Sequence, residues 1–403
     1  MLRLYMFYKM ITKGRNILIV LFLLHVSLIH AAKSLSNKAQ FSFLVGAPNN
    51  SSVFSIFGHA SLRIDDPELN IDYIFNYGVF DRSNIDNISQ LIKGNLYCEL
   101  WVYDTNEYMG RIRQAGIGLK EHVLNLLPEE KEALWQHLIS IGKNRSGRYH
   151  YDILRSNCAT LPRMSIEKAL SGKIVYNDAD YKPLGGYDDY CEPYLKPYPW
   201  IHFFAYFFFG NSIGNPLLFK ESLFLPYNLE AAFQSAVIHS DSDSRPLIAS
   251  SSVLVENFPE KISHGFFSPS VVGWILFAVI LILSLIEWKK KSYFRALDFI
   301  LFGIAGLFGI ILFLLNTVFA EWYTIYGYHL LWLHPLHLLG IFFFVCKKFK
   351  RQAYYYHFIN LIALLTGAIV LYNFGILERL LITVAPYMLT LGVRSIFGLI
   401  RRI

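Results

Sequence analysis

The pattern of hydrophobic and polar positions changes abruptly near residue 268. Residues 33–197 carry charges and turn residues at the density of a globular domain, whereas residues 268–403 consist of long apolar runs separated by short charged loops. Runs of this kind have the length at which a helix crosses a bilayer. We therefore predict a folded domain over residues 33–267, followed by an all-α membrane domain over residues 268–403.

The membrane domain contains five apolar runs, each near the length of a membrane-spanning helix. Basic residues follow the first, third and fifth runs, while the loops after the second and fourth runs carry only Glu321 and Glu378 as charges. Because Lys and Arg concentrate on the cytoplasmic side, this alternation places the preceding domain outside the cytoplasm. The predicted spans are residues 270–286, 298–317, 328–346, 355–373 and 379–400.

The N-terminal segment supports export of the folded domain. Basic residues precede the apolar run at residues 17–29, and the small residues Ala31 and Ala32 follow it. This order is typical of a secretory signal. We predict that residues 1–32 form either such a signal or an uncleaved N-terminal anchor.

Alternation of apolar and polar residues in the exported domain predicts strands, and one segment clearly predicts a helix. Residues 127–142 place Pro128 early, Glu129 and Glu130 in the first turn, and apolar residues on one face. We predict an α+β fold, with residues 240–252, rich in Ser and Asp, as a loop or linker. Strands are expected within residues 41–47, 61–64, 72–80, 95–103, 116–126 and 149–154, with a short helix over 105–114.

Residues 199–210, PWIHFFAYFFFG, are intensely aromatic but too short to span a bilayer alone. Two interpretations stay open. The run forms a core helix of the exported domain, or it forms a surface that enters the outer face of the membrane or lines a path for lipid chains.

Composition narrows the classes of partner and cofactor. The 403 residues are 54% hydrophobic and carry a net charge of +7. Because many of the basic residues lie at the ends of apolar runs, where they set topology, the charge does not indicate nucleic-acid binding. The four cysteines match no zinc-binding spacing, so no metal and no cofactor is predicted. Cys98 and Cys191 are candidates for a disulfide that leaves Cys158 free.

Cys158 is the candidate nucleophile. It follows a strand-like run and precedes a helix-like one, in the stretch YHYDILRSNCATLPR at residues 149–163. Free N–H groups and the positive end of a helix dipole favour a thiolate there. Asn157 is the predicted N-cap of that helix.

A nucleophilic cysteine needs a base, and His59 in FGHASLRI is the candidate. A third polar residue on the neighbouring strand would orient the imidazole. Asp72 and Asn76 share one face of that strand. We favour Asp72, because an anionic partner stabilises the imidazolium that forms when the thiol loses its proton.

Three histidines, His329, His334 and His337, lie near the outer end of the third predicted span, beside Pro335. Imidazoles at that depth indicate either a functional site or an interfacial belt shared with Trp332. Two histidines three residues apart, without a third ligand, are a weak metal signal.

The motifs taken together resemble the Lnb family of lipoprotein N-acyltransferases. They are GHASLRI at residues 58–64, FNYGVFD at 75–81, YHYDILRSNCAT at 149–160 and LLW-x-x-PL at 330–336, and the resemblance extends over most of the chain. The sequence departs from the family at Leu161 and Pro162, where members are more polar, and at Gly327 and His329, where members carry asparagine.

The resemblance implies a fold and a reaction. The fold is circularly permuted papain-like, as in lecithin:retinol acyltransferase, with the histidine strand before the cysteine helix. Cys158 would accept an acyl chain from a membrane phospholipid and pass it to the α-amine of the diacylglyceryl-cysteine of an apolipoprotein. The protein would lie in a bacterial inner membrane as a multi-pass protein, with its catalytic domain in the periplasm. Arg63 and Tyr77 are candidate supporting residues.

Two other functions fit the same residues. An exported, membrane-anchored cysteine peptidase or cell-wall amidase would use the same cysteine and histidine, because the fold does not choose the acyl donor. A non-catalytic membrane scaffold or sensor would bind a ligand through the exported domain and would keep its function without the thiol. The five predicted spans and the aromatic run favour a substrate that is held in the membrane.

Overall fold

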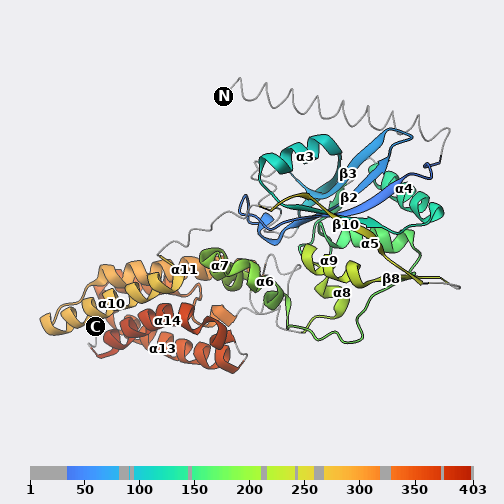
Figure 1. The fold of residues 1–403 in the computed structure, drawn as a ribbon. Helices are drawn as coiled ribbons and strands as arrows, with labels where there is room; N and C mark the ends of the chain where they lie inside the picture. Colours follow the sequence, from blue (N-terminus) through green and yellow to red (C-terminus); the bar gives the residue numbers. More distant parts are fainter. Residues whose placement is uncertain are drawn as a thin grey trace, which may run out of the picture. The chain divides into compact units, whose positions relative to one another are not determined.

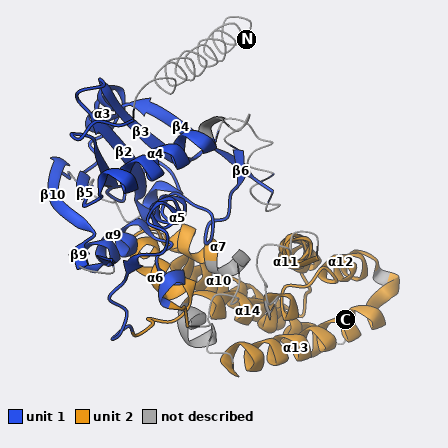
Figure 2. Cartoon of the chain, turned by 90° about the vertical axis from the view of Figure 1, so that its right-hand side faces the viewer, with its two compact units in different colours: residues 1–90, 95–181, 219–260 blue, residues 91–94, 182–218, 261–403 orange. Residues whose placement is uncertain are grey.

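The computed structural model describes residues 34–80, 90, 95–143, 148–209, 216–240, 244–257, 267–317, 328–373 and 376–400. The predicted signal or anchor, residues 1–32, lies outside these ranges. The chain divides into two compact units, which Figure 2 distinguishes by colour. The first holds residues 1–90, 95–181 and 219–260, and the second holds residues 182–218 and 261–403.

The first unit is built on an antiparallel sheet of seven strands in the order β10-β5-β1-β2-β3-β4-β6 (Figure 1). Its centre, β1 to β3, is a meander in which Phe43 pairs with Leu62 and Leu62 pairs with Phe75. The strands are β1 Gln40–Gly46, β2 His59–Asp66, β3 Ile71–Val79, β4 Tyr97–Asp104, β5 Leu119–Leu124, β6 Arg148–His150 and β10 Ile248–Val255.

Helices cover both faces of this sheet, and the α+β prediction is confirmed. They are α3 Thr105–Gln114, α4 Pro128–Lys143, α5 Thr160–Ala169, α8 Phe219–Ser222 and α9 Pro226–Ser235. Asp104 caps α3 by accepting hydrogen bonds from the N–H groups of Asn106 and Glu107. A smaller sheet joins β7 Ile174–Val175, β8 Val237–His239 and β9 Ser244–Pro246.

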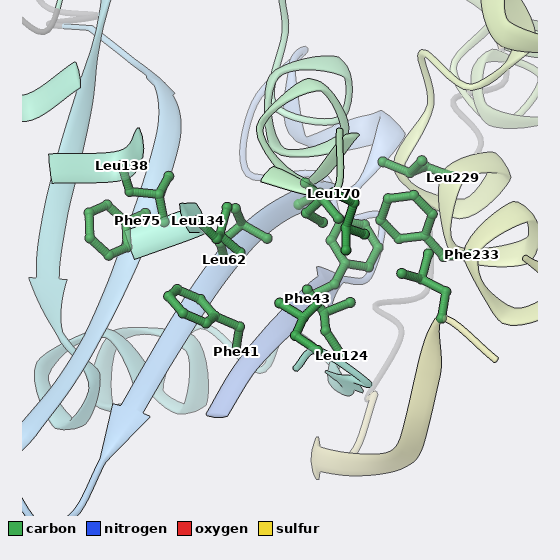
Figure 3. Close-up of a cluster of buried hydrophobic side chains, with 14 of the residues drawn as sticks. Phe41, Phe43, Leu62, Phe75, Leu124, Leu134, Leu138, Leu170, Leu229 and Phe233 are labelled. Carbon is green, nitrogen blue, oxygen red and sulfur yellow. The ribbon is translucent and has the colours of Figure 1, made fainter. Parts of the chain in front are cut away.

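The main core lies on one face of the sheet, where alternate residues of β1, β2 and β3 meet α4, α5 and α9. Phe41, Leu62 and Phe75 are fully or almost fully buried there against Leu134 and Leu138 of α4 (Figure 3). Each such side chain contributes about 1.5–3 kcal/mol by leaving water. On the other face, Ile74 packs with Tyr108 and Met109 of α3. Burial on both faces fixes the register of the central strands.

The prediction of a loop at residues 240–252 is wrong. Within these residues the chain forms β9 and most of β10, and β10 pairs with β5 at the edge of the large sheet. Its serines are exposed, as is usual on an edge strand, while Ile248 and Val255 are less exposed. The polar composition resembled a linker because backbone pairing, rather than side-chain burial, holds this strand.

The second unit is helical. Residues 182–218, which the sequence analysis assigned to the exported domain, group with it and form α6 Tyr187–Leu195 and α7 Pro199–Phe209. Four helices are long and apolar enough to span a membrane, counted among the described residues. They are α10 Pro269–Lys290, α11 Arg295–Thr317, α13 Lys350–Asn373 and α14 Ile376–Ile400. In α14, the part that is long and apolar enough is Thr383–Ile400.

The third predicted span is not one continuous helix. A 3-10 turn, η2 Tyr328–Leu331, is followed by irregular backbone around Pro335 and by the short helix α12 His337–Val345. Proline removes a backbone donor and clashes with the preceding turn, which explains the interruption. Whether this segment completes a fifth crossing stays a prediction.

The three histidines of this segment contact other polar groups of the bundle. His337 hydrogen-bonds the hydroxyl of Tyr356 and the carbonyl of Trp332, and the Trp332 indole donates to His329. The rings of His334 and His337 stack with centroids 4.0 Å apart.

A buried ion cluster joins three of the long helices. Arg394 of α14 is fully buried, and its Nε donates to Asp298 of α11 at 2.6 Å. Its Nη1 donates to Ser284 at 2.9 Å and to Glu287, both on α10. Removing one partner from such a cluster leaves an uncompensated buried charge. The cluster therefore fixes how α10, α11 and α14 pack.

We predict that Arg394→Ala destabilises the helical unit by about 3–5 kcal/mol, because Asp298 and Glu287 lose their cation. Thermal unfolding of the purified protein in detergent measures this as a lower transition temperature. Arg351→Ala is the control, because the Arg351 side chain is exposed and contacts Tyr355 on its own helix. Equal transition temperatures for the two variants would contradict the prediction.

Candidate active site

Asn157 builds the turn that presents Cys158. Its side-chain oxygen accepts hydrogen bonds from the N–H groups of Ala159 at 2.8 Å and Thr160 at 2.9 Å. Its amide nitrogen donates to the carbonyls of Ile153 at 2.6 Å and Phe224 at 2.9 Å. Every polar group of this buried amide is thus used to fix the loop before α5. Cys158 lies two residues before the helix begins, and Ala159, not the predicted Asn157, occupies the N-cap position.

The start of α5 tolerates the Leu161-Pro162 pair. Pro162 is the third residue of the helix, where a backbone N–H has no intrahelical acceptor. Ala159 and Ile166 are fully buried and pack the helix onto the main core. The cysteine is therefore held by a rigid element.

His59 begins β2, directly after a glycine whose conformation the turn requires. Gly58 has φ +79°, and a Cβ there would lie 2.8 Å from the carbonyl oxygen of Gly46. His59 itself pairs with Gly46 across the β1–β2 ladder. The Gly-His pair of the motif therefore has a structural reason: only glycine lets the chain enter β2 at this position.

Asn76 of β3 is the residue that contacts the imidazole. His59 Nε2 and Asn76 Oδ1 form a hydrogen bond. A carbonyl oxygen only accepts, so Nε2 carries the proton and Nδ1 is left as the basic nitrogen. The thiol of Cys158 also hydrogen-bonds the His59 side chain. The structure thus brings Cys158, His59 and Asn76 together.

The surroundings of Cys158 favour its ionised form. Burial acts to raise the pKa of this half-buried thiol. The charge of His59, the hydrogen bond to His59 and backbone hydrogen bonds at Ala60 and Cys158 act in the opposite direction and outweigh burial, so the pKa is lowered. A thiolate at lower pH is what nucleophilic chemistry requires.

Asp72, the favoured orienting residue, lies elsewhere. The register places Asp72 opposite Asp65, which is six residues beyond His59 on β2, or about 20 Å along the strand. Arg63 donates to both carboxylate oxygens of Asp72, at 2.8 and 2.9 Å, and Thr105 donates to one of them at 2.6 Å. Asp72 is therefore part of an ion-pair network rather than a partner of the imidazole.

Arg63 and Tyr77, the candidate supporting residues, contact other parts of the domain. Arg63 bridges Asp72 and Glu121, and the hydrogen bond to Asp72 raises the pKa of its guanidinium. Tyr77 points into the main core, where its hydroxyl lies 3.0 Å from Ser165 Oγ on α5. Burial raises the pKa of Tyr77 to about 12. Tyr77 thus ties β3 to the cysteine helix.

Two residues near the cysteine were not predicted as site residues. Gly78 has φ +84°, and a Cβ on it would lie 3.9 Å from the Cβ of Cys158. The hydroxyl of Tyr149 accepts a hydrogen bond from the N–H of Gly78. The glycine in FNYGVFD and the first tyrosine of YHYDIL were the available signals, because both lie within the quoted motifs.

Cys98 and Cys191 are less suited to reaction than Cys158. All four cysteines lie within the described ranges and are free thiols, so the candidate disulfide between Cys98 and Cys191 is not formed. Burial raises the pKa of Cys98 and of Cys191 to about 12. No group of three or more His, Cys, Asp or Glu side chains among the described residues is placed to hold a metal ion.

The fold and the site define a membrane-anchored protein whose α+β domain carries a candidate cysteine–histidine site. Comparison with family models agrees at both ends of the chain. The Lnb N-terminal periplasmic domain matches residues 33–190, and the Lnb transmembrane domain matches residues 261–403. The chain belongs to the Lnb family of lipoprotein N-acyltransferases. No curated protein and no solved structure matches it.

Family membership establishes the location of the protein and suggests its broad role. The protein is a multi-pass inner-membrane protein with an N-terminal periplasmic domain. Membership also suggests an acyltransferase-like role that involves lipoproteins and membrane lipid.

We predict that Cys158 reacts with iodoacetamide at lower pH than an ordinary thiol. Because its pKa is lowered mainly through His59, His59→Ala moves the midpoint of the pH–rate profile upward, to or above that of an ordinary thiol. Peptide mass analysis identifies the labelled site, and Cys158→Ser is the blank. Identical profiles for wild type and His59→Ala would show that the pair is not coupled.

The roles of Asn76 and Asp72 can be distinguished by comparing their alanine variants. Asn76→Ala removes the hydrogen bond that orients the imidazole, and we expect alkylation at acidic pH to slow roughly tenfold, equivalent to about 1.4 kcal/mol. Asp72→Ala is expected to leave the alkylation rate unchanged and to lower the melting temperature, because Arg63 loses one of its carboxylate partners. The reverse pattern would restore Asp72 as the orienting residue.

Proposed function

We propose that this protein transfers an acyl chain from a membrane phospholipid to the N-terminal amine of a diacylated apolipoprotein, through a thioester on Cys158. The observation that carries the proposal is the hydrogen-bonded series Cys158, His59 and Asn76 in a periplasmic domain joined to membrane-spanning helices. A phospholipid ester and a lipoprotein amine are substrates that such a protein meets in its own membrane. The family match supports the same choice.

The first half-reaction forms the thioester. His59 Nδ1 takes the proton of the Cys158 thiol, and the thiolate attacks an ester carbonyl carbon of the phospholipid. The tetrahedral adduct collapses, the bond to the glycerol oxygen breaks, and that oxygen takes the proton back from the imidazolium. The products are an acyl-enzyme and a lysophospholipid. Asn76 holds the ring through Nε2 while Nδ1 exchanges the proton.

The second half-reaction transfers the chain to nitrogen. The free α-amine of the diacylglyceryl-cysteine attacks the thioester carbonyl, and His59 Nδ1 accepts a proton from that amine. Collapse of the adduct breaks the carbon–sulfur bond and releases the thiolate of Cys158 beside the imidazolium. An amide is formed and the resting pair is restored. A thioester reacts with amines far faster than an oxygen ester does. Forming the thioester therefore activates the acyl chain for transfer to the amine.

Both half-reactions develop negative charge on a carbonyl oxygen, and backbone donors are suited to stabilise it. The N–H of Cys158 is the natural contributor, because it lies before the first turn of α5 and Asn157 occupies the N–H groups of the next two residues instead. Asn76 is neutral, so the imidazolium is stabilised here by a hydrogen bond rather than by a carboxylate.

The proposal is tested by intact mass of the purified protein in phospholipid micelles. Wild type is expected to gain the mass of one acyl chain, whereas Cys158→Ser and His59→Ala are not. A diacylated lipopeptide with a free amine discharges the adduct, and the same peptide with a blocked amine does not.

Absence of the adduct, under conditions where a thiol reagent labels Cys158, would exclude the phospholipid donor. Peptide and cell-wall amides would then be the substrates to test. Adduct formation with discharge by water alone would indicate a hydrolase.

A further inference from the structure

An uncharged aromatic segment lies within the helical unit and takes no part in the proposed chemistry. From Pro197 to Phe219 the sequence contains no Asp, Glu, Lys or Arg. Its described helix, α7, spans 11 residues, or about 16 Å, which is roughly half of a bilayer core. A helix of this length and composition has neither the polar face of a surface helix nor the length of a span.

Contacts within the unit place α7 at the outer end of α10. Its Phe203 ring lies 5.9 Å from the ring of Tyr387 on α14. The Trp200 indole donates to the carbonyl of Phe267 at 2.8 Å, and the Tyr387 hydroxyl donates to the carbonyl of Pro269 at 2.7 Å. Pro269 is where the chain enters the first span from the periplasmic side. The segment is therefore fixed at the level where that span meets the outer surface.

One face of α7 is apolar and partly exposed. Trp200 and Phe204, four residues apart on one helix face, are 39% and 36% exposed and stack with ring centroids 6.0 Å apart. Phe267, at the entry to α10, is 61% exposed. On α10 itself, Trp274 lies five residues after the helix begins and is 43% exposed. Aromatic rings thus continue the surface of a membrane-spanning helix.

We propose that α7 lies in the outer leaflet of the membrane and that Trp200, Phe204 and Phe267 contact phospholipid there. Two arguments select lipid as the partner. The exposed rings are continuous with a surface that already faces the bilayer, and the region between Pro197 and Phe219 has no charge to keep it in water. Tryptophan also favours this depth, because its ring is apolar and its N–H is satisfied here by Phe267.

Brominated phosphatidylcholine tests the proposal in reconstituted vesicles. Bromines near the top of the acyl chains quench the fluorescence of nearby indoles. The difference in emission between wild type and Trp200→Phe gives the fluorescence of Trp200. We expect brominated lipid to quench that fluorescence strongly. Trp274→Phe is the positive control, and Trp101→Phe, in β4 of the periplasmic domain, is the negative control. If brominated lipid quenches the fluorescence of Trp200 no more than that of Trp101, α7 does not contact lipid.

A second measurement links the surface to catalysis and rests on the proposed function. The double variant Trp200→Gln/Phe204→Gln is expected to raise the KM for a bilayer-borne phospholipid several-fold. Acylation of Cys158 by a short-chain, water-soluble ester should be unchanged. Loss of both activities would indicate that the substitutions damage the fold. That result would argue against a specific lipid contact. Failure of wild type with both donors would instead overturn the proposed function, while the quenching result would stand independently.

Discussion

The candidate site depends on how Asn157 satisfies the backbone around Cys158. One buried amide accepts from two N–H groups before and at the start of α5. It donates to the carbonyl of Ile153 in its own loop and to that of Phe224 in a distant part of the domain. Each bond is worth about 1 kcal/mol net, but an unsatisfied buried group would cost more. The turn is therefore rigid, and the thiol is held beside His59.

The main core holds the partners of this turn in register. Ala159 and Ile166 pack α5 onto the sheet, and Tyr77 links β3 to the same helix through Ser165. Asn76, next to Tyr77, then points to the opposite face and contacts His59. A slip of one residue between β2 and β3 would reverse these faces. Packing on one side of the sheet and the candidate site on the other are thus set by the same register.

Sequence reasoning singled out Cys158 and His59, which the structure brings together, because each lies in a motif with a local physical meaning. One motif is a helix start and the other is a glycine before a strand. It predicted most strands and the long helices from periodicity. It chose Asp72 over Asn76 because both share a strand face, and only the β2–β3 register and the side-chain contact show that Asn76 is the one near His59. It missed β10 because an edge strand is held by backbone pairing, which leaves little trace in side-chain pattern.

The membrane unit shows the same limit. Hydropathy located α10, α11, α13 and α14 closely, but it gave no sign that Arg394, Asp298 and Glu287 would meet across three helices. It also left open whether the aromatic run belongs to the periplasmic domain. The contacts of Phe203 and Trp200 assign it to the helical unit.

The central claim is that the Cys158 thiol passes an acyl chain to a lipoprotein amine. Its most direct test is the N-terminal lipopeptide of a reporter lipoprotein, analysed by mass spectrometry from a bacterial host that lacks other N-acyltransferases. Wild type should yield a peptide heavier by one amide-linked acyl chain, and Cys158→Ser should yield only the diacylated form. Triacylated peptide from Cys158→Ser would contradict the account, as would diacylated peptide alone from a stable, membrane-inserted wild type.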